Sequence, residues 1–401
     1  MRIAMIGGKG APAAIGGVER HIEELGARLV AGGFDVLVYA RPWYVQRRAG
    51  TERKHRGMRV IVLASIATKH LDAITHTFLS TLHAMRERVD IYHFHGVGPS
   101  LLAWLPRLFR PHARVIATFH CVDRKHAKWG WFAREVLAFG EWAACRFPHE
   151  TIAVGMTLQT YCLNRYKRET TYIPNGIQRV PDSARSPEAV ADLARFGLTS
   201  KRYLLVVSRL VEHKEVHTVI DAFRTMQCEY PEYADLQLAI VGSPAFTDAY
   251  GDELRFCAAG NSNIRFLGQR SGAVLDALFA NCLAFVHASR SEGLPIVVLE
   301  AGAAGVVPIV SDIPEHREVV AQTGGILFQT GNPWDCATKL AVTLRNPDVL
   351  NRIGAEIQAA CVRTYNWEGV TAQTAGRYQS LIAEVLVRER PTARPWARVV
   401  V

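Results

Sequence analysis

The stretch from Leu283 to Ala301, LAFVHASRSEGLPIVVLEA, joins a short apolar run, a polar loop and a second apolar run. The first run, Leu283–His287, is typical of a buried strand, and the loop after it contains Gly293 and Pro295. Glycine permits a tight turn, and proline is favoured in the first turn of a helix. The stretch therefore predicts a strand, a loop and a helix in succession, which is the repeating unit of parallel α/β folds.

The same alternation of apolar strands and helices extends along both halves of the chain. In the first half the predicted strands are Arg2–Ile6, Asp35–Ala40, Arg59–Leu63, Ile91–His95 and Arg114–Phe119. In the second half they are Tyr203–Val207, Leu236–Val241, Asn263–Leu267, Leu283–His287 and Val307–Val310. Helices are predicted between them, for example over Val18–Ala31 and Val216–Met226. The pattern predicts two α/β domains with parallel sheets.

A break in this pattern marks the domain boundary. Ile173–Gly176 is a turn sequence, and Val180–Glu188 is rich in proline, serine and charge. A chain of 401 residues is long enough for two domains at about 100–200 residues each. We expect an N-terminal domain over residues 1–180 and a second domain over 181–375. We expect residues 376–401 to form a helix or tail that packs back toward the first domain.

Composition narrows the class of protein. Charged residues make up 21% of the chain, and its apolar runs are shorter than the ~20 residues that span a bilayer. The start of the sequence lacks the apolar region of a signal peptide. Eight cysteines without CxxC spacing indicate neither a disulfide framework nor a zinc ribbon. These features favour a reduced, cytoplasmic protein.

The positive charge is concentrated in the first half. Residues 1–178 hold 25 Lys and Arg against 13 Asp and Glu, whereas residues 179–401 hold 22 against 24. The surplus suggests an anionic partner such as nucleic acid, an acidic lipid surface or a phosphorylated substrate, although a solvated basic surface would give the same count. The basic residues are scattered without a nucleic-acid reading motif, which disfavours nucleic acid.

Glycines follow the first predicted strand, where parallel sheets bind ligands. Residues 8–13 formally fit the GxGxxA pattern of nicotinamide dehydrogenases. That pattern should open directly into a helix and be followed by an acid after the second strand. Here Pro12 interrupts it, and the second strand ends in Ala40 and Arg41. Gly16 and Gly17 instead open the first helix and offer its free amides to an anion.

Two further loops carry candidate ligand-binding residues. Arg209 and Lys214 follow the strand Tyr203–Val207, and a forked donor beside a point charge suits a diphosphate. Glu292 and Glu300 follow the strand Leu283–His287, and carboxylates accept hydrogen bonds from sugar or ribose hydroxyls. Taken alone, the basic pair would more often be two exposed residues on a loop. Glu300, however, lies in an apolar stretch, where an acid usually has a partner.

Taken together, these motifs resemble those of retaining glycosyltransferases of family 4. The markers are Gly16–Glu19, Asn175–Gly176, the pair Arg209 and Lys214, and the acids Glu292 and Glu300 with seven residues between them. The resemblance implies the GT-B fold, in which two Rossmann-like domains face each other across a cleft. Residues 92–100 and 125–130 are more narrowly similar to bacterial rhamnosyltransferase-like enzymes of surface-polysaccharide assembly.

The resemblance also implies roles for individual residues. Arg209 and Lys214 would bind the donor diphosphate, Glu292 the donor sugar and Glu300 the ribose. His120, after the strand Arg114–Phe119, would contact the transferred sugar. The remaining residues expected to line the donor site are Gly16, Gly17, Gly293, Leu294 and Pro295.

The sequence departs from the family pattern at Ser208, Cys121 and Glu215, where relatives often carry glycine. We expect the acid at 215 to weaken the hold of Lys214 on phosphate. His93 and His95 alternate on one strand and could pair on a metal, but no third ligand is evident in the sequence. An acceptor pocket formed by both histidines with Asp123 and Lys128 is favoured instead, and no metal or cofactor is expected.

The resemblance implies transfer of a sugar from a nucleotide-diphosphate sugar, held by the second domain, to an acceptor hydroxyl on the first. The acceptor is expected to be a sugar or a lipid-linked sugar of cell-surface polysaccharide or glycolipid assembly. A non-hydrolysing sugar-nucleotide epimerase and a catalytically silent scaffold remain alternatives. Residues 101–110 and 69–88 mix basic with apolar side chains, which suits peripheral binding to the anionic inner face of a membrane.

Overall fold

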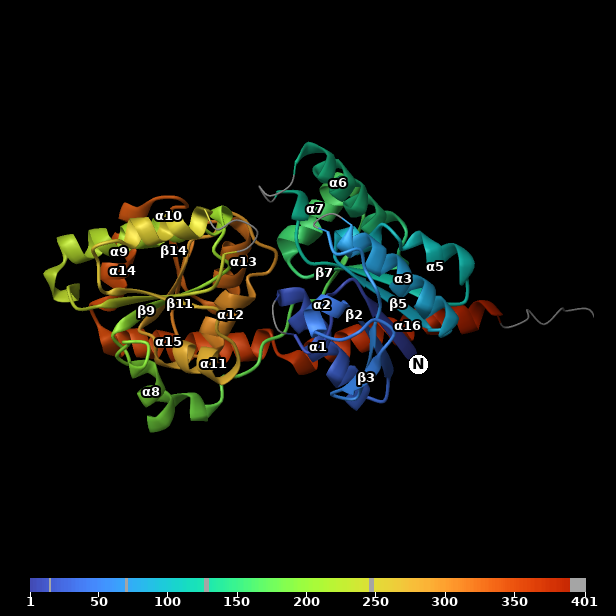
Figure 1. Cartoon of the computed structure of the whole chain (residues 1–401), viewed down its shortest axis with the longest axis horizontal. Helices are drawn as coiled ribbons and strands as arrows, with labels where there is room; N and C mark the ends of the chain where they lie inside the picture. Colours follow the sequence, from blue (N-terminus) through green and yellow to red (C-terminus); the bar gives the residue numbers. More distant parts are fainter. Residues whose placement is uncertain (14–15, 69–70, 126–129, 245–248, 390–401) are drawn as a thin grey trace, which may run out of the picture.

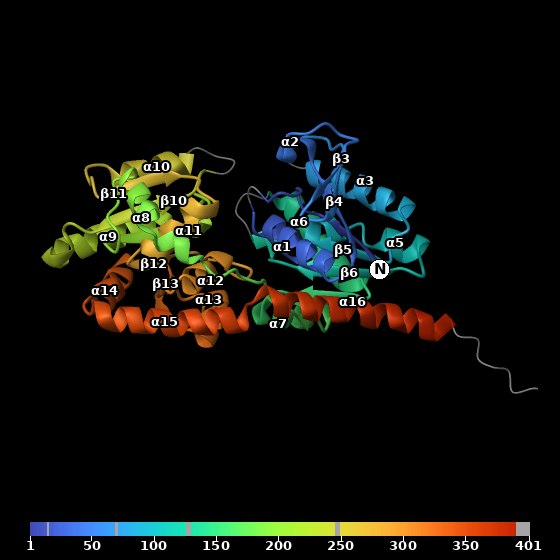
Figure 2. The same ribbon diagram turned by 90° about the horizontal axis from the view of Figure 1, so that it is seen from below.

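The computed structural model describes residues 1–13, 16–68, 71–125, 130–244 and 249–389 and contains two α/β domains side by side (Figure 1). The last two helices, α15 (Pro347–Thr364) and α16 (Trp367–Glu389), run along one side of the molecule. Figure 2 shows α15 beside the second domain and α16 beside the first. Among the described helices, none is both long and apolar enough to cross a membrane.

The first sheet has eight strands in the order β3-β4-β2-β1-β5-β6-β7-β8, parallel except between β3 and β4. The strands are β1 (Arg2–Ile6), β2 (Asp35–Ala40), β3 (Glu52–His55), β4 (Met58–Val62), β5 (Ile91–His95), β6 (Arg114–Phe119), β7 (Glu150–Ala153) and β8 (Thr171–Tyr172). The helices of this domain are α1 (Gly17–Ala31), α2 (Pro42–Val45), α3 (Asp72–Arg86), α4 (Val97–Ser100), α5 (Trp104–Phe109), α6 (Trp131–Arg146) and α7 (Met156–Tyr166).

Both faces of the first sheet are buried under helices. On one face Ile3 and Met5 of β1 pack in a cluster with Leu25 of α1 and Tyr378 of α16. On the other face the alternate residues of β1 pack in a cluster that includes parts of α3, α6 and α7. Successive side chains of a strand point to opposite faces, so strands covered on both sides are apolar throughout.

The last helix belongs to the first domain along most of its length. Trp367, Val370, Tyr378 and Leu381 of α16 all lie in the core cluster of the first sheet. We expected the chain to return to the first domain at residue 376, but it does so already at Trp367. The cause is Trp367 itself, because its indole is 3% exposed and covers Gly176 at the end of the linker.

The second sheet has six parallel strands in the order β11-β10-β9-β12-β13-β14. They are β9 (Tyr203–Val207), β10 (Gln237–Val241), β11 (Ile264–Gly268), β12 (Ala284–His287), β13 (Pro308–Ser311) and β14 (Ile326–Phe328). The other helices of this half are α8 (Pro187–Ala194), α9 (Val216–Glu229), α10 (Ala249–Ala258), α11 (Gly272–Asn281), α12 (Ile296–Ala303), α13 (Pro314–Thr323) and α14 (Pro333–Leu344).

Each of the ten predicted strands coincides with an observed strand to within a residue or so at its ends. The four that the sequence pattern missed are β3, β7, β8 and β14. Three of these lie at sheet edges, where strands are often short: β3 is charged, β8 has two residues, and β14 is apolar but has only three. β7 is internal, but it has four residues and begins with Glu150, so it shows no long apolar run.

The two sheets bring the loops after their strands toward each other. The loop after β12 and the residue after β6 meet directly, because a Cβ on Gly293 would lie 1.9 Å from the carbonyl oxygen of His120. Glycine is therefore the residue that permits this approach of the two backbones. The carboxyl ends of the strands in both sheets, where parallel sheets bind ligands, therefore face the same region between the domains.

Candidate active site between the two domains

A cavity of about 450 Å³ lies between the domains and is lined by residues of both. The first domain contributes Gly16, Gly17 and Arg20 at the start of α1. The second contributes residues of α12 and of the loops that follow β9, β10 and β11. Loops after parallel strands are the usual ligand-binding elements of such sheets, so this cavity is the candidate active site.

The N-terminal ends of α1 and α12 approach each other at the cavity. A Cβ on Gly17 would lie 3.1 Å from Cδ1 of Ile296, the first residue of α12. Gly16 has a φ of 111°, and a Cβ there would lie 1.9 Å from Oε2 of Glu19. A larger residue at position 16 would therefore displace that carboxylate. The free amides of two helix starts give this region a positive potential suited to an anion.

Glu300 on α12 faces α1 across the cavity. Its Oε1 accepts a hydrogen bond from Nη1 of Arg20, forming an ion pair between the two domains. Burial raises the pKa of the Glu300 carboxyl, and the Arg20 guanidinium opposes that rise. Arg20 was not among the predicted site residues, although it directly follows the motif Gly16–Glu19 and lies about one helical turn after Gly16.

Lys214 and Glu292 meet in one buried ion pair. Nζ of Lys214 donates to Oε1 of Glu292, and both side chains are 12% exposed. The same oxygen lies 2.8 Å from Nε2 of His287, at the end of β12. Burial by itself would raise the pKa of Glu292, but Lys214 and His287 hold it well below the usual range. The two residues that we predicted to bind different parts of a donor are therefore direct partners.

Arg209 and Ser208 line the cavity in the loop after β9. Arg209 is exposed, whereas Oγ of Ser208 is buried and makes no hydrogen bond with the described residues. A buried hydroxyl without a partner is uncommon, and a ligand oxygen or nitrogen in the cavity would satisfy it.

Glu215 forms an ion pair with Arg290, and its effect on the binding of phosphate by Lys214 stays a prediction. Its carboxylate is buried and accepts a hydrogen bond from Nε of Arg290, which compensates its charge. Its backbone has a φ of 48°, in the left-handed region that glycine adopts most readily. The conformation explains why glycine suits this position.

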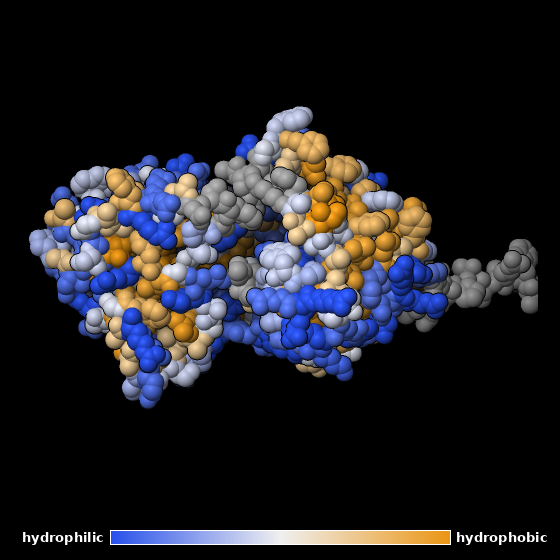
Figure 3. Space-filling model, viewed as in Figure 1, coloured by the Kyte–Doolittle hydropathy of each residue, from blue (hydrophilic) through white to orange (hydrophobic). Residues whose placement is uncertain are grey.

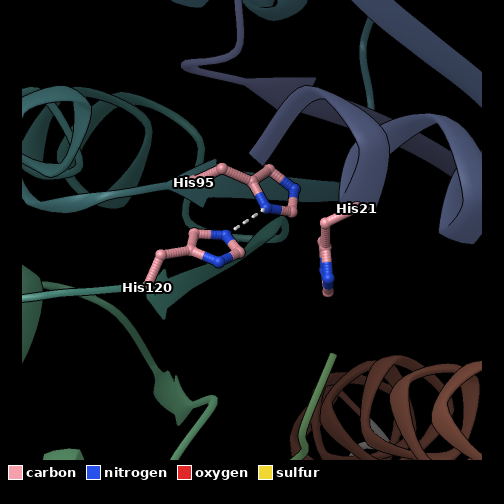
Figure 4. Close-up of side chains that lie close together, drawn as sticks. All are labelled: His21, His95 and His120. Carbon is pink, nitrogen blue, oxygen red and sulfur yellow. Dashed lines mark hydrogen bonds between the residues drawn. The ribbon is translucent and has the colours of Figure 1, made fainter. Parts of the chain in front are cut away.

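Three histidines from separate elements of the first domain gather beside the domain interface (Figure 4). His95 at the end of β5 and His120 after β6 lie 3.3 Å apart between Nδ1 and Nε2. The ring centroid of His21, on α1, lies 5.0 Å from the ring centroid of His120. Burial lowers the pKa of His21 to about 4 and those of His95 and His120 well below the usual range. All three imidazoles are therefore neutral near pH 7.

The structure brings the predicted acceptor pocket together only in part, because the ring centroids of His93 and His95 lie 4.1 Å apart, whereas Asp123 lines a cavity that neither histidine lines. His93 is buried, and its two ring nitrogens lie 2.6 Å from the hydroxyl of Tyr378 and 2.7 Å from that of Thr118, so neither faces the cleft. Asp123 accepts a hydrogen bond from Sγ of Cys121 at 3.3 Å and lines a separate, apolar cavity. Lys128 lies outside the described residues.

The structure groups three histidines that could hold a metal ion, but His93 of the predicted pair is not among them. Beside His95, the described residues place His21 and His120, with one ligand atom of each within 4.8 Å of the others. A second group of this kind consists of His287, Glu292 and His316 in the second domain. Sequence spacing could not indicate the first group, because His21 lies on a helix, His95 ends one strand and His120 follows another, far apart in the chain.

Both halves of the chain match known families. Residues 15–179 match the family described as Glycosyltransferase Family 4, and residues 193–359 match the family described as Glycosyl transferases group 1. A phosphatidyl-myo-inositol mannosyltransferase of Mycobacterium leprae is 29% identical over 91% of this chain and 93% of its own length. A glycogen synthase of Mycobacterium tuberculosis is 27% identical over 94% of each chain.

Solved structures share the two-domain arrangement. Sucrose-phosphate synthase from Thermosynechococcus elongatus has a TM-score of 0.79 at 20% identity and covers 96% of this chain and 100% of its own. Anabaena Alr3699/HepE, solved in complex with UDP-glucose, has a TM-score of 0.76 at 19% identity, with coverage of 95% and 100%. The chain belongs to the glycosyltransferases of the GT-B fold, with a Glycosyltransferase Family 4 domain followed by a glycosyl transferases group 1 domain.

Proposed function

We propose that the chain transfers a sugar from a nucleotide-diphosphate sugar to an acceptor hydroxyl, with retention of the anomeric configuration. The observation that carries the proposal is the cavity between the domains, where Arg209, Glu300 and the starts of α1 and α12 line one space. The UDP-glucose in the solved structure of Anabaena Alr3699/HepE supports a sugar nucleotide as the donor.

In this proposal the donor diphosphate lies between the two helix starts. Arg209 and Lys214 bind it and stabilise the charge that develops on the leaving nucleoside diphosphate. Lys214 can do so while bonded to Glu292, because an ammonium group has three donor hydrogens. Ser208 donates its unpartnered hydroxyl to the same region. The main-chain amides around Gly293, Leu294 and Pro295 line the diphosphate path.

The two acids bind hydroxyls of the donor on either side of the diphosphate. Glu300 accepts hydrogen bonds from the ribose, and Glu292 accepts them from the transferred sugar. Glu292 remains ionised near neutral pH because its pKa is held low, which suits an acceptor of hydrogen bonds. His120 contacts the transferred sugar from the first domain.

The reaction that we propose is a same-face substitution at the anomeric carbon. The bond from that carbon to the diphosphate oxygen breaks, and a bond to the acceptor oxygen forms on the same side of the ring. The proton of the acceptor hydroxyl passes to an oxygen of the departing phosphate. Arg209, Lys214 and the helix starts provide the positive charge for this step, so we propose that turnover needs no metal ion.

We further propose that the enzyme acts on surface-polysaccharide or glycolipid acceptors at the inner face of a membrane. The first domain exposes ten large apolar side chains on α3, α5 and α6, and Figure 3 shows apolar residues gathered over these helices. The ten are Phe78, Leu79, Trp104, Leu108, Phe109, Trp131, Phe132, Val136, Phe139 and Trp142, which we call the apolar face. The lipid named for the Mycobacterium leprae relative supports a lipid acceptor.

Basic side chains border the apolar face. Arg86 and Arg88 at the end of α3 and Arg107 on α5 are exposed. Of the stretch 101–110, Leu105 and Pro106 are buried, whereas Trp104, Leu108 and Phe109 are exposed. Exposed aromatic and leucine side chains beside arginines suit an interface with anionic lipid headgroups.

The experiment that tests the activity compares transfer by the wild type with that by Arg209→Ala and Lys214→Ala. Each variant should lose about 10²–10³-fold in rate, because each removes a charge at the developing diphosphate. Arg202→Ala is a matched control, because Arg202 pairs with Asp235 near the opposite end of β9 and should leave the rate unchanged. The anomeric configuration of the product, determined by proton NMR, tests retention. Near-normal rates in both variants would contradict the site.

A further inference from the structure

A second cavity, of about 900 Å³, lies in the first domain outside the site described above. It is formed where the start of α3, the helix α4 and the start of α6 come together. Its described lining is almost wholly apolar and includes Ile74, Pro99, Leu101, Trp131, Phe132 and Leu137. The volume is that of a typical small-molecule site, but polar groups for recognition are scarce. An apolar ligand fits such a lining best.

Two aromatic residues in the wall of this cavity are unusually exposed to solvent. Trp131 is 77% exposed and Phe132 is 73% exposed, at the first two positions of α6. Both also belong to the apolar face. Contiguous exposed apolar surface is unfavourable in water and marks sites that bind apolar partners. The cavity therefore opens within the surface that we propose to contact the membrane.

One residue in the lining of the cavity lies close to the domain interface. Asp123 is the one charged residue among the described residues that line it. Asp123 contacts Cys121, and Cys121 follows His120, whose carbonyl oxygen meets Gly293 of the second domain. A ligand that fills the cavity and reaches Asp123 would have its polar end near the proposed donor sugar.

We infer that this cavity holds the hydrocarbon chain of a lipid-linked acceptor, with the acceptor sugar at Asp123. The inference rests on the proposed function, because it assigns the acceptor of that reaction. A flexible chain can fill an irregular apolar hollow, whereas its head group needs a polar residue at one end, which Asp123 provides. The positive surplus of the first domain matches the anionic bilayer from which such a lipid would enter.

Chain binding can be measured without knowing the acceptor sugar. The probes are alkyl β-glucosides of six, eight and ten carbons, kept below their micelle concentrations and titrated by calorimetry into the full chain. Each methylene that enters the cavity should tighten binding by up to about fourfold. The dependence on chain length should disappear in Ala133→Phe, because Ala133 lines the cavity and a larger side chain there would fill it.

A matched pair of variants separates the cavity from general surface hydrophobicity. Phe132→Ser should weaken binding of the ten-carbon probe at least about tenfold. Phe256→Ser, an equal change at a residue that is 82% exposed on α10 of the second domain, should leave it unchanged. Circular dichroism and binding of a nucleoside diphosphate by the second domain check that each variant is folded.

The outcomes separate this inference from the proposed function. Chain-length-dependent binding that Ala133→Phe abolishes supports the cavity, even in a protein that shows no transfer. Binding that is independent of chain length, or equal in Ala133→Phe and wild type, overturns it. The inference is also overturned if Phe132→Ser loses vesicle binding but binds the ten-carbon probe as tightly as the wild type. In that case the aromatic side chain would contact the bilayer surface and not a chain in the cavity.

Discussion

Arg20 on α1 donates a hydrogen bond to Glu300 on α12, so the two domains are joined by an ion pair inside the candidate active site. A carboxylate accepts about four hydrogen bonds, so Glu300 can bind ribose hydroxyls while it remains bonded to Arg20. The ion pair would thus orient the carboxylate before the donor arrives. Burial raises the pKa of Glu300, which makes the nearby guanidinium important for keeping it ionised.

Glu300→Gln should therefore weaken the binding of the nucleoside diphosphate by about 10–100-fold, the value of a hydrogen bond to a charged group. Glu318→Gln is the matched control. Glu318 also joins the second domain to the first, accepting from the amides of Met156 and Thr157 at 2.8 and 3.1 Å, but it does not line the cavity. Calorimetry measures both affinities, and an equal loss in the two variants would show that Glu300 acts only through domain contact.

Glu292 should make the fold sensitive to acid. The pKa of Glu292 in the folded protein lies below the ordinary value of 4.5. Its ionised form therefore stabilises the fold above pH 4.5, and this stabilisation is lost as the pH falls through the pKa of the folded state. Glu292→Gln should be less stable than the wild type at pH 7, with the difference shrinking as the pH falls below 4.5. Urea unfolding across this range tests it. A constant difference would mean that Glu292 keeps the same charge state in the folded and unfolded protein.

Chelation should leave transfer unchanged. The positive charge at the proposed diphosphate site comes from Arg209, Lys214 and the two helix starts, which a chelator cannot remove. The measurement is the transfer rate of enzyme dialysed against EDTA, with and without Mg²⁺, Mn²⁺ or Zn²⁺ added back. A full loss of rate that one of these ions restores would contradict the proposal. His21, His95 and His120 would then be the first candidates for the metal ligands.

Vesicle binding should depend on anionic lipid and weaken with salt. Replacing Arg86, Arg88 and Arg107 with Ser should reduce sedimentation with phosphatidylglycerol vesicles, at about 1 kcal/mol for each basic residue near the surface. Arg110 is a poorer choice for this test, because its Nη2 donates to the carbonyl of Met85 and its loss would disturb the fold. Failure of the wild type to bind anionic vesicles at low salt would assign the positive surplus to another partner.

The fold could be predicted because its strands are short apolar runs separated by helices and turns. The run Tyr203–Val207 is buried at all five positions, as both faces of a central parallel strand require. β3 could not be predicted in this way, because its sequence ERKH is charged and pairs antiparallel at an edge. The return of α16 at Trp367 also escaped prediction, since it depends on where one indole packs.

The candidate site could be predicted only in part. Motif residues that follow strands, such as Arg209 and Glu300, do line one cavity, because the carboxyl ends of parallel strands lie at one edge of a sheet. Their partners are set by the contact between domains and by loop conformation. The bonds of Arg20 to Glu300 and of Lys214 to Glu292 join residues 280 and 78 positions apart. No sequence spacing indicates such pairs.

The histidines also show that sequence patterns do not predict the partners of a side chain. The alternation of His93 and His95 correctly places both on one face of β5, where their rings lie 4.1 Å apart between centroids. It does not show that Tyr378 of α16 and Thr118 occupy the nitrogens of His93. It also does not show that His21 of α1 approaches His95 and His120. Burial and partners, which decide what each imidazole can bind, come from the packing of distant elements.

Every proposed role in the cavity between the domains requires that a nucleotide binds there. The deciding measurement is the thermal unfolding of the wild type and of Arg209→Ala with each of the common nucleoside diphosphates. At 100 times its dissociation constant, a ligand stabilises the fold by about 2.7 kcal/mol. We predict that at least one nucleoside diphosphate raises the melting temperature of the wild type and has a much smaller effect on Arg209→Ala. No shift in the wild type with any of them, or an equal shift in both proteins, would contradict the account.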